Sequence, residues 1–343
     1  MKKFLIILIV LAGGIYYVWL GISNPLDSGS DVEKLFRIEK GEGIEEVSSK
    51  LEETHLIKNK SLFRIYVVFS GNTRRLKAGS YLLSPSMSII QIVDKIVSGE
   101  TVEESLTFIE GWKIKDIAWY LENKGLFQAE ELFEIVGYPT VDYLEEGMPA
   151  PKNFSDEYDF LKDKPRKMSL EGYLFPDTYY IGSDDNLEDI VLMTLDNFDK
   201  KLNNKIREDI KNQGKSIFEI ITMASLIEKE VRTLEDKKIV SGVLWKRMEN
   251  GVPLQVDATI AYITDKKTTK ISIEETKIDS PYNTYKYTGL PLGPISNPGL
   301  ESILASVYPE SSEYWYYLST PEGETIFSRN LEEHNIAKAK YLK

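Results

Sequence analysis

Apolar residues recur three and four positions apart in several stretches of the chain, the spacing that places them on one face of a helix. Two of these stretches, residues 38–52 and 108–122, share a longer pattern of a short apolar strand, a glycine turn and then the helix. A third, partial copy begins at Tyr81, with Ser88 opening a helix that runs through Ile96. Such strand–turn–helix units predict an α+β protein. They occur in small binding modules and are also a general packing solution.

The N-terminus carries an uncharged apolar run from Phe4 to Ile22, preceded by Lys2 and Lys3. As a helix, at about 1.5 Å per residue, the run is long enough to cross a bilayer core, and the flanking lysines favour a cytoplasmic N-terminus. No small-residue cleavage site follows, so we expect an uncleaved anchor, with a cleaved signal peptide as the alternative. The expected order is a cytoplasmic end at residues 1–3, a transmembrane helix at 4–22 and a linker at 23–34.

The most informative helix is predicted from Ser216 to about Thr233. Ser216 is a candidate N-cap, and Glu219 three residues later completes a capping box. At 100° per residue, Glu228 falls inside the apolar sector of this helix, whereas Lys229 points away. An ionised glutamate in that sector costs several kcal/mol unless it is paired, neutral or open to a cleft.

Two interpretations of Glu228 follow. One is a structural salt bridge, for which Lys229, Arg232 or Lys237 would supply the charge. The other is a proton donor, because apolar neighbours raise the pKa of a glutamate from about 4.3 toward roughly 6 and keep it protonated near neutrality.

The segment 289–299 is rich in proline and glycine, so it is neither a helix nor a central strand. Its apolar spacing indicates a stiff loop, and Asn297 with Pro298 predicts the capped start of a helix that runs through Val307. Together with the Tyr-, Asn- and Thr-rich stretch at 279–285, such a loop suits a sugar polymer, which needs flat aromatic faces and many hydrogen-bond partners. An ordinary surface loop packed on the core is the alternative.

Composition excludes several chemistries. Lys and Arg number 42 against 54 Asp and Glu, for a formal net charge of −12, which disfavours a nucleic-acid partner. The chain has no Cys and only two His. Disulfides, thiolate nucleophiles and Cys-based zinc sites are therefore ruled out, and we expect no metal site.

Five ordered motifs resemble the YceG-like (MltG) family of endolytic murein transglycosylases. They are Met-Ala-Ser-Leu-Ile-Glu-Lys-Glu at 223–230, Leu-Gln-Val-Asp-Ala-Thr at 254–259, and the segments 280–285, 289–299 and 333–335. The resemblance covers essentially the whole chain. It implies a small LysM-like α+β module at residues 35–104 and a YceG-like α+β catalytic domain at 105–343, of which 105–167 could form a subdomain.

The resemblance also implies an activity. The expected enzyme is a membrane-anchored lytic transglycosylase that cuts nascent peptidoglycan strands between MurNAc and GlcNAc and leaves 1,6-anhydroMurNAc ends. Glu228 would act first as general acid and then as base, with no cofactor, and peptidoglycan synthases are candidate partners. The residues expected to bind substrate or support the site are Glu230, Gln255, Asp257, Thr259, Ser280, Tyr282, Asn283 and Thr284.

Two other functions remain open. A lysozyme-type hydrolase needs a second carboxylate, for which Asp257, Glu171 and Asp177 are available. A noncatalytic scaffold would bind glycan and recruit wall-synthesis enzymes. The chain also departs from the family pattern at three positions, Leu292, Thr325 and Asn330, where many members carry Pro, His and Thr.

Overall fold

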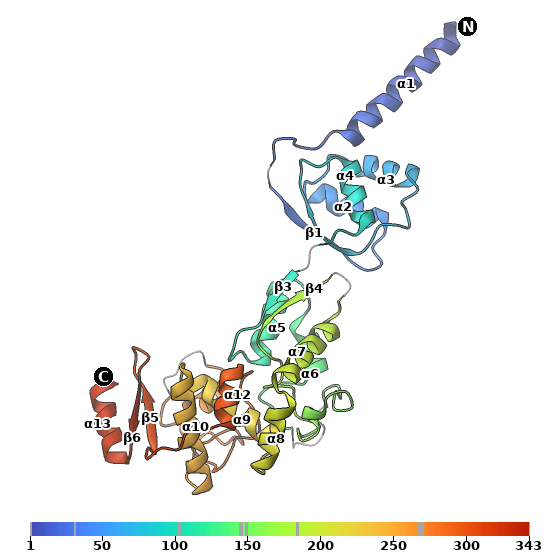
Figure 1. Cartoon of the computed structure of the whole chain (residues 1–343). Helices are drawn as coiled ribbons and strands as arrows, with labels where there is room; N and C mark the ends of the chain where they lie inside the picture. Colours follow the sequence, from blue (N-terminus) through green and yellow to red (C-terminus); the bar gives the residue numbers. More distant parts are fainter. Residues whose placement is uncertain are drawn as a thin grey trace. The chain divides into compact units, whose positions relative to one another are not determined.

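The computed structural model (Figure 1) describes residues 2–30, 32–101, 104–143, 147, 150–182, 185–266 and 271–342. The side chains of residues 2–3 and 5–10 are outside this description. The chain divides into two units, the first made of Met1–Leu106 with Tyr180–Asn186 and the second of Thr107–Tyr179 with Leu187–Lys343.

In the first unit, helices pack on a two-stranded antiparallel sheet in which Phe36 lies opposite Tyr81. Its elements are α1 (Lys2–Ser23), β1 (Lys34–Ile38), α2 (Ile44–Glu53), α3 (Lys60–Phe69), β2 (Gly79–Leu83) and α4 (Ile89–Ser98). The core forms because the apolar face of each helix is buried: Val47 and Leu51 from α2 meet Phe63 from α3 and Ile92 from α4.

The helices of the repeated pattern are confirmed. Residues 44–53 form α2 and the second copy forms α5 (Ile114–Asn123). Helix α4 begins where Ser88 accepts a hydrogen bond from the Gln91 N–H while the Gln91 side chain caps the Ser88 N–H, and it ends at Gly99 with φ of 77°. Local capping chemistry thus fixes both ends of this helix.

The transmembrane helix expected over residues 4–22 coincides with α1, whose C-terminal end packs on α3 and α4. Among the described residues, however, no helix combines the length and apolar character needed to cross a membrane. That part of the expectation finds no support in the structure.

The second unit is mainly helical with short two-stranded sheets, β3 with β4 and β5 with β6. Its elements are β3 (Glu104–Thr107), α5, α6 (Ala129–Val136), the 3₁₀ turn Asp159–Leu161, β4 (Thr178–Ile181), α7 (Leu187–Lys201), α8 (Asn204–Asn212), α9 (Ile217–Glu230), α10 (Leu234–Glu249), α11 (Asp257–Thr264), the 3₁₀ turn Glu275–Lys277, α12 (Leu300–Val307), β5 (Tyr316–Ser319), β6 (Thr325–Ser328) and α13 (Leu331–Tyr341). The first residues of β3 and the last of β4 are assigned to the first unit. Helices together with small sheets confirm the α+β prediction.

Helix α9 is the centre of the second unit, where it packs against α12, α10 and α11. Its residues 220–227 are all buried. The predicted capping box of Ser216 and Glu219 is present, but the helix ends at Glu230 rather than near Thr233. The reason is local: Val231 is extended, with φ of −142°, and the Thr233 side chain caps the start of α10.

Asn297 joins three segments beneath the N-terminus of α12. Its Oδ1 accepts hydrogen bonds of 3.0 Å from the N–H groups of Gly172 and Leu174, and its Nδ2 donates to the Trp112 carbonyl at 2.9 Å. The cap of α12 is therefore Gly299 and not Asn297 as predicted, although the helix does end at Val307. Asn297 is 1% exposed and holds the loop rather than the helix.

Candidate active site

Glu228 lies in the last turn of α9, directly after its fully buried stretch, and its side chain is 9% exposed. All of its polar contacts are made by Oε2. This oxygen accepts hydrogen bonds from Ser302 Oγ at 2.6 Å and from the Gly299 N–H at 3.0 Å, and Lys237 Nζ lies 3.6 Å away. The structure therefore contains an ion pair between Glu228 and Lys237, which was the structural interpretation of Glu228 in the sequence analysis.

The other oxygen of Glu228 is available for chemistry. No described residue donates a hydrogen bond to Oε1, and Oε1 is not among the buried atoms that lack a partner, so solvent reaches it. Because donors already occupy Oε2, a proton carried by this carboxyl belongs on Oε1. A carboxyl with one fixed oxygen and one open oxygen can deliver a proton and later take one back.

A second carboxyl lies beside Glu228, and the sequence analysis did not single it out. A Cβ added to Gly299 would come within 2.0 Å of Glu110 Oε1, so the Glu110 carboxyl rests directly on this glycine. Burial and the neighbouring charge of Glu228 raise the pKa of Glu110, while Lys237 opposes the shift. In the sequence, Glu110 stood out only as part of the repeated strand–turn–helix pattern, where it directly precedes the turn glycine. The first copy of the pattern has Lys40 at that position.

Glu230 belongs to a different cluster. Burial and the nearby charge of Asp257 raise its pKa to about 7, although hydrogen bonds with the Tyr317 hydroxyl and the Ala258 backbone act in the opposite direction. Asp257 in turn accepts a short hydrogen bond from Tyr285 Oη. A glutamate protonated near neutrality is therefore present on α9, two positions from the one we expected.

The expected groove residues divide into exposed and buried ones. Gln255 and Asp257 are exposed, and Gln255 Oε1 accepts a hydrogen bond of 2.7 Å from Arg247. Tyr282 and Asn283, which we expected to line a glycan groove, are 3% and 1% exposed. The loop turns these two side chains inward, and their role in glycan binding stays a prediction.

The buried members hold the loop to the start of α11. Thr284 Oγ1 accepts from the Val256 N–H at 3.0 Å and lies 3.1 Å from Thr259 Oγ1. Asn283 Nδ2 donates to the carbonyl of Ile278 at 2.7 Å. Ser280 is partly buried, and its Oγ accepts a 3.3 Å hydrogen bond from the Tyr282 N–H. These residues support the loop beside Asp257, and their hydrogen-bonding groups are engaged within the protein.

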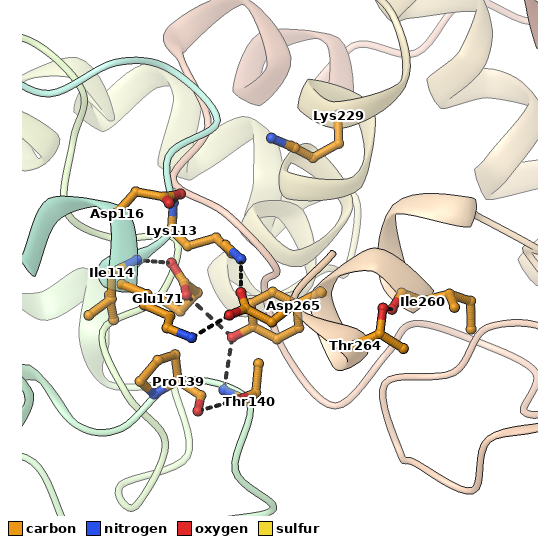
Figure 2. A network of polar contacts seen from close by, with 12 residues as sticks. Lys113, Ile114, Asp116, Pro139, Thr140, Glu171, Lys229, Ile260, Thr264 and Asp265 are labelled. Atoms are coloured by element: carbon orange, nitrogen blue, oxygen red, sulfur yellow. Dashed lines mark hydrogen bonds and ion pairs between the residues drawn. The ribbon is translucent and has the colours of Figure 1, made fainter. Parts of the chain in front are cut away.

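The second carboxylates considered for a hydrolase do not bond to Glu228. Glu171 is fully buried: its Oε1 accepts from the Ile114 N–H at 2.9 Å and its Oε2 from Tyr262 Oη at 3.3 Å (Figure 2). Burial raises the pKa of Glu171 to about 8. Asp177 pairs instead with Asn197, whose Nδ2 donates at 2.9 Å. Both carboxyls therefore have structural partners.

The positions that depart from the family pattern have local explanations in two cases. Thr325 Oγ1 donates to Asp236 at 2.9 Å and so ties β6 to α10. Asn330 caps α13 by accepting from the Glu333 N–H at 2.9 Å, a role that threonine also performs. Leu292 is partly buried, and nothing in the structure explains the substitution.

Comparison with known proteins finds relatives along nearly the whole chain. The profile of the YceG-like family matches residues 36–340. An endolytic murein transglycosylase of Bacillus subtilis (strain 168) is 31% identical over 339 residues, covering 97% of this chain and 91% of that protein. One from Streptococcus pneumoniae (serotype 2 strain D39 / NCTC 7466) is also 31% identical and covers 99% of this chain, which spans 64% of the relative.

A solved structure agrees. The crystal structure of a yceG-like protein from Listeria monocytogenes has a TM-score of 0.59 and 33% sequence identity, over 90% of this chain and 100% of that one. The match covers most of the chain rather than one motif alone. This chain belongs to the YceG-like family.

Proposed function

We propose that this protein is a lytic transglycosylase that cuts peptidoglycan strands internally, between MurNAc and GlcNAc, with Glu228 as its acid and base. Family membership and the activity named for its relatives support the class of reaction. The observation that supports Glu228 is its geometry: one oxygen is held by Ser302 and Gly299, and the other is open.

The reaction balances with one carboxyl. The proton on Glu228 Oε1 passes to the glycosidic oxygen, and the C1–O bond breaks with its electron pair remaining on that oxygen. The C6 hydroxyl of the same MurNAc then bonds to C1 and gives its proton back to Oε1. The Ser302 hydroxyl, the Gly299 N–H and Lys237 stabilise the carboxylate that exists between these two proton transfers.

Glu230 is a second candidate for the same role. Its pKa of about 7 is suited to proton transfer near neutrality, and it lies on the same helix. Its carboxyl, however, is engaged by Tyr317 and Ala258, whereas Glu228 keeps a free oxygen. We therefore assign the acid to Glu228 and a supporting role to Glu230.

The test uses full-length protein and purified peptidoglycan strands. Glu228→Gln keeps the size of the side chain and removes its titration, so cleavage should fall by at least about 10³-fold, whereas Glu230→Gln should retain measurable cleavage. Thermal melting of both variants shows whether the fold is intact. Folded Glu228→Gln that cleaves like wild type would reject the assignment and favour a noncatalytic scaffold. Full loss in Glu230→Gln alone would move the acid to that residue.

A hydrolase remains the second candidate function, because Glu110 supplies a carboxyl next to Glu228. A hydrolase adds water across the cleaved bond, so its products are one water heavier than 1,6-anhydro products. Mass spectrometry of the cut ends separates the two reactions. Anhydro ends are the expected result.

The cellular position and the partners are separate proposals. The substrate class favours catalysis outside the cytoplasm, and Lys2 and Lys3 ahead of the apolar run favour anchoring by residues 4–22. Sodium carbonate extraction of membranes should leave the protein in the pellet, and its release would refute the anchor. A LysM-like module at 35–104 is predicted to bind glycan, which a pull-down with purified glycan tests. Association with peptidoglycan synthases is a separate prediction, which co-purification tests.

A further inference from the structure

A small cavity with cationic walls lies in the second unit, in the segment between α6 and β4. Its volume is about 110 Å³, and its lining comes from residues 152–170. Among the described residues that line it, every charged one is a cation: Lys152, Lys162, Lys164 and Arg166. The chain as a whole has a formal net charge of −12, so this local excess of positive charge indicates a site for an anion.

Lys164 is a half-buried cation of this cavity. Its Nζ donates to the carbonyls of Pro165 at 3.2 Å and Met168 at 2.5 Å, and no carboxylate of the described chain pairs with it. Burial lowers the pKa of Lys164 to about 8, because carbonyls only partly replace the water that the ammonium loses. An anion in the cavity would stabilise the charged form of this lysine.

Arg166 is exposed, and its guanidinium has no hydrogen-bond or ion-pair partner in the part of the chain that the structure describes. The planar guanidinium can donate two parallel hydrogen bonds to a carboxylate. Lys152 and Lys162 already have carboxylate partners, so they add less to the charge of the cavity. The unbalanced charge therefore comes from Lys164 and Arg166.

The size of the cavity limits what can enter it. Pockets for drug-sized ligands measure about 300–1,000 Å³, and one water takes up about 30 Å³ of the liquid. A volume of about 110 Å³ therefore suits a compact end group such as a carboxylate rather than a whole disaccharide. The apolar part of the lining is buried and can pack against the carbon atoms that carry this group; it consists of Phe154, Leu161 and Leu170.

The segment that carries the cations is tied to the N-terminal end of α9, the far end from Glu228. Asp163 Oδ2 accepts hydrogen bonds from the N–H groups of Ile217 at 2.6 Å and Phe218 at 3.4 Å. A rise of about 1.5 Å per residue places Ile217 roughly 17 Å from Glu228 along the helix axis. A group bound in the cavity therefore belongs to a different part of the substrate from the bond that is cut.

We propose that this cavity binds a carboxylate on the peptides of the peptidoglycan strand. The inference rests on the proposed function, because that function makes peptidoglycan the substrate. In a strand that carries its peptides, the muramic acid carboxyl is used in the amide link to the peptide, so the free carboxylates are those of the peptides. The cavity thus recognises the peptide part of a substrate whose glycan part is cut at Glu228.

The first test measures binding without cleavage. Saturation-transfer NMR detects binding of the free stem peptide to the full-length protein, and the same peptide with its carboxyls converted to amides is the matched ligand. Wild type should bind the carboxylate form and not the amide form. Arg166→Gln should weaken this binding about tenfold, whereas Arg166→Lys, which keeps the charge, should retain most of it. Lys167→Gln removes an exposed neighbouring cation that does not line this cavity, and should bind as wild type does.

The second test measures cleavage of peptide-bearing strands, either native or with their carboxyls amidated. On native strands Arg166→Gln should raise KM about fivefold and leave kcat within about twofold, because the lost contact lies away from the reacting bond. On amidated strands Arg166→Gln and wild type should have the same KM, since the partner of Arg166 is already absent.

The outcomes separate the two proposals. Equal binding of the two peptides by wild type, or unchanged binding in Arg166→Gln, overturns the carboxylate site. Binding of inorganic phosphate at Arg166 without binding of the peptide overturns it as well. Folded Glu228→Gln that cleaves like wild type rejects the proposed function, while carboxylate-dependent peptide binding that is lost in Arg166→Gln would still support the cavity as a carboxylate site.

Discussion

Replacement of Glu171 by glutamine should make the protein more stable at alkaline pH than wild type. Glu171 is fully buried, and its pKa rises from an ordinary 4.5 to about 8 on folding. Glutamine is the same size and carries no charge. Its amide can keep the acceptor for the Ile114 N–H and donate to Tyr262 Oη, so the packing is preserved.

The sign follows from proton binding. Between pH 4.5 and pH 8 the folded state holds a proton on Glu171 that the unfolded state has lost, so the free energy of unfolding falls as pH rises. The contribution is complete below pH 4.5 and is lost on passing through pH 8. From pH 6 to pH 8 wild type should therefore lose about 2 kcal/mol more than Glu171→Gln.

Urea unfolding followed by tryptophan fluorescence measures this difference. Trp112, Trp119, Trp245 and Trp315 all lie in the second unit, so the signal reports mainly on the unit that contains Glu171. Other groups titrate in the same window, and subtracting the two proteins removes their shared contribution. Equal pH dependence in wild type and Glu171→Gln would refute the reasoning.

Three further predictions concern Glu228 and Glu230 of α9. Ser302→Ala removes the 2.6 Å hydrogen bond to Glu228 and should lower kcat by roughly 10- to 100-fold with little change in melting temperature; unchanged kcat in steady-state assays would contradict it. Lys237→Met leaves Glu228 without its buried counter-charge and should cost about 3 kcal/mol in urea unfolding, whereas a loss below about 1 kcal/mol would show that the pair is dispensable. Tyr317→Phe removes a hydrogen bond that lowers the pKa of Glu230, so this pKa should rise above about 7 in a carboxyl ¹³C NMR titration; a fall would contradict the assigned partner.

The sequence was sufficient where structure is decided locally. The capping box at Ser216 and the helix opened by Ser88 were both predicted, because the cap and the helix it starts are adjacent in the chain. The end of α9 was not predicted correctly. Val231 continues the apolar periodicity of the helix, and only the cap made by Thr233 at the start of α10 explains why the helix stops before it.

The site was predicted in part for a related reason. The position of Glu228 in the apolar sector marked it as unusual, but Glu110 reaches Gly299 only through folding of segments far apart in sequence. Tyr282 and Asn283 carry groups suited to sugar binding, yet Asn283 uses its amide to close its own loop. Residue type alone does not distinguish a side chain that faces a ligand from one that supports the loop.

The buried amide of Asn297 has a chemical consequence. Spontaneous loss of ammonia from asparagine proceeds when the backbone nitrogen of the next residue attacks the side chain and closes a five-membered imide. Here the next residue is Pro298, which has no N–H, so this ring cannot form. Asn297, which holds three segments together beneath the site, is therefore protected from deamidation through a cyclic imide. No aspartate forms by that route beside Glu171, to which the Asn297 amide donates a hydrogen bond.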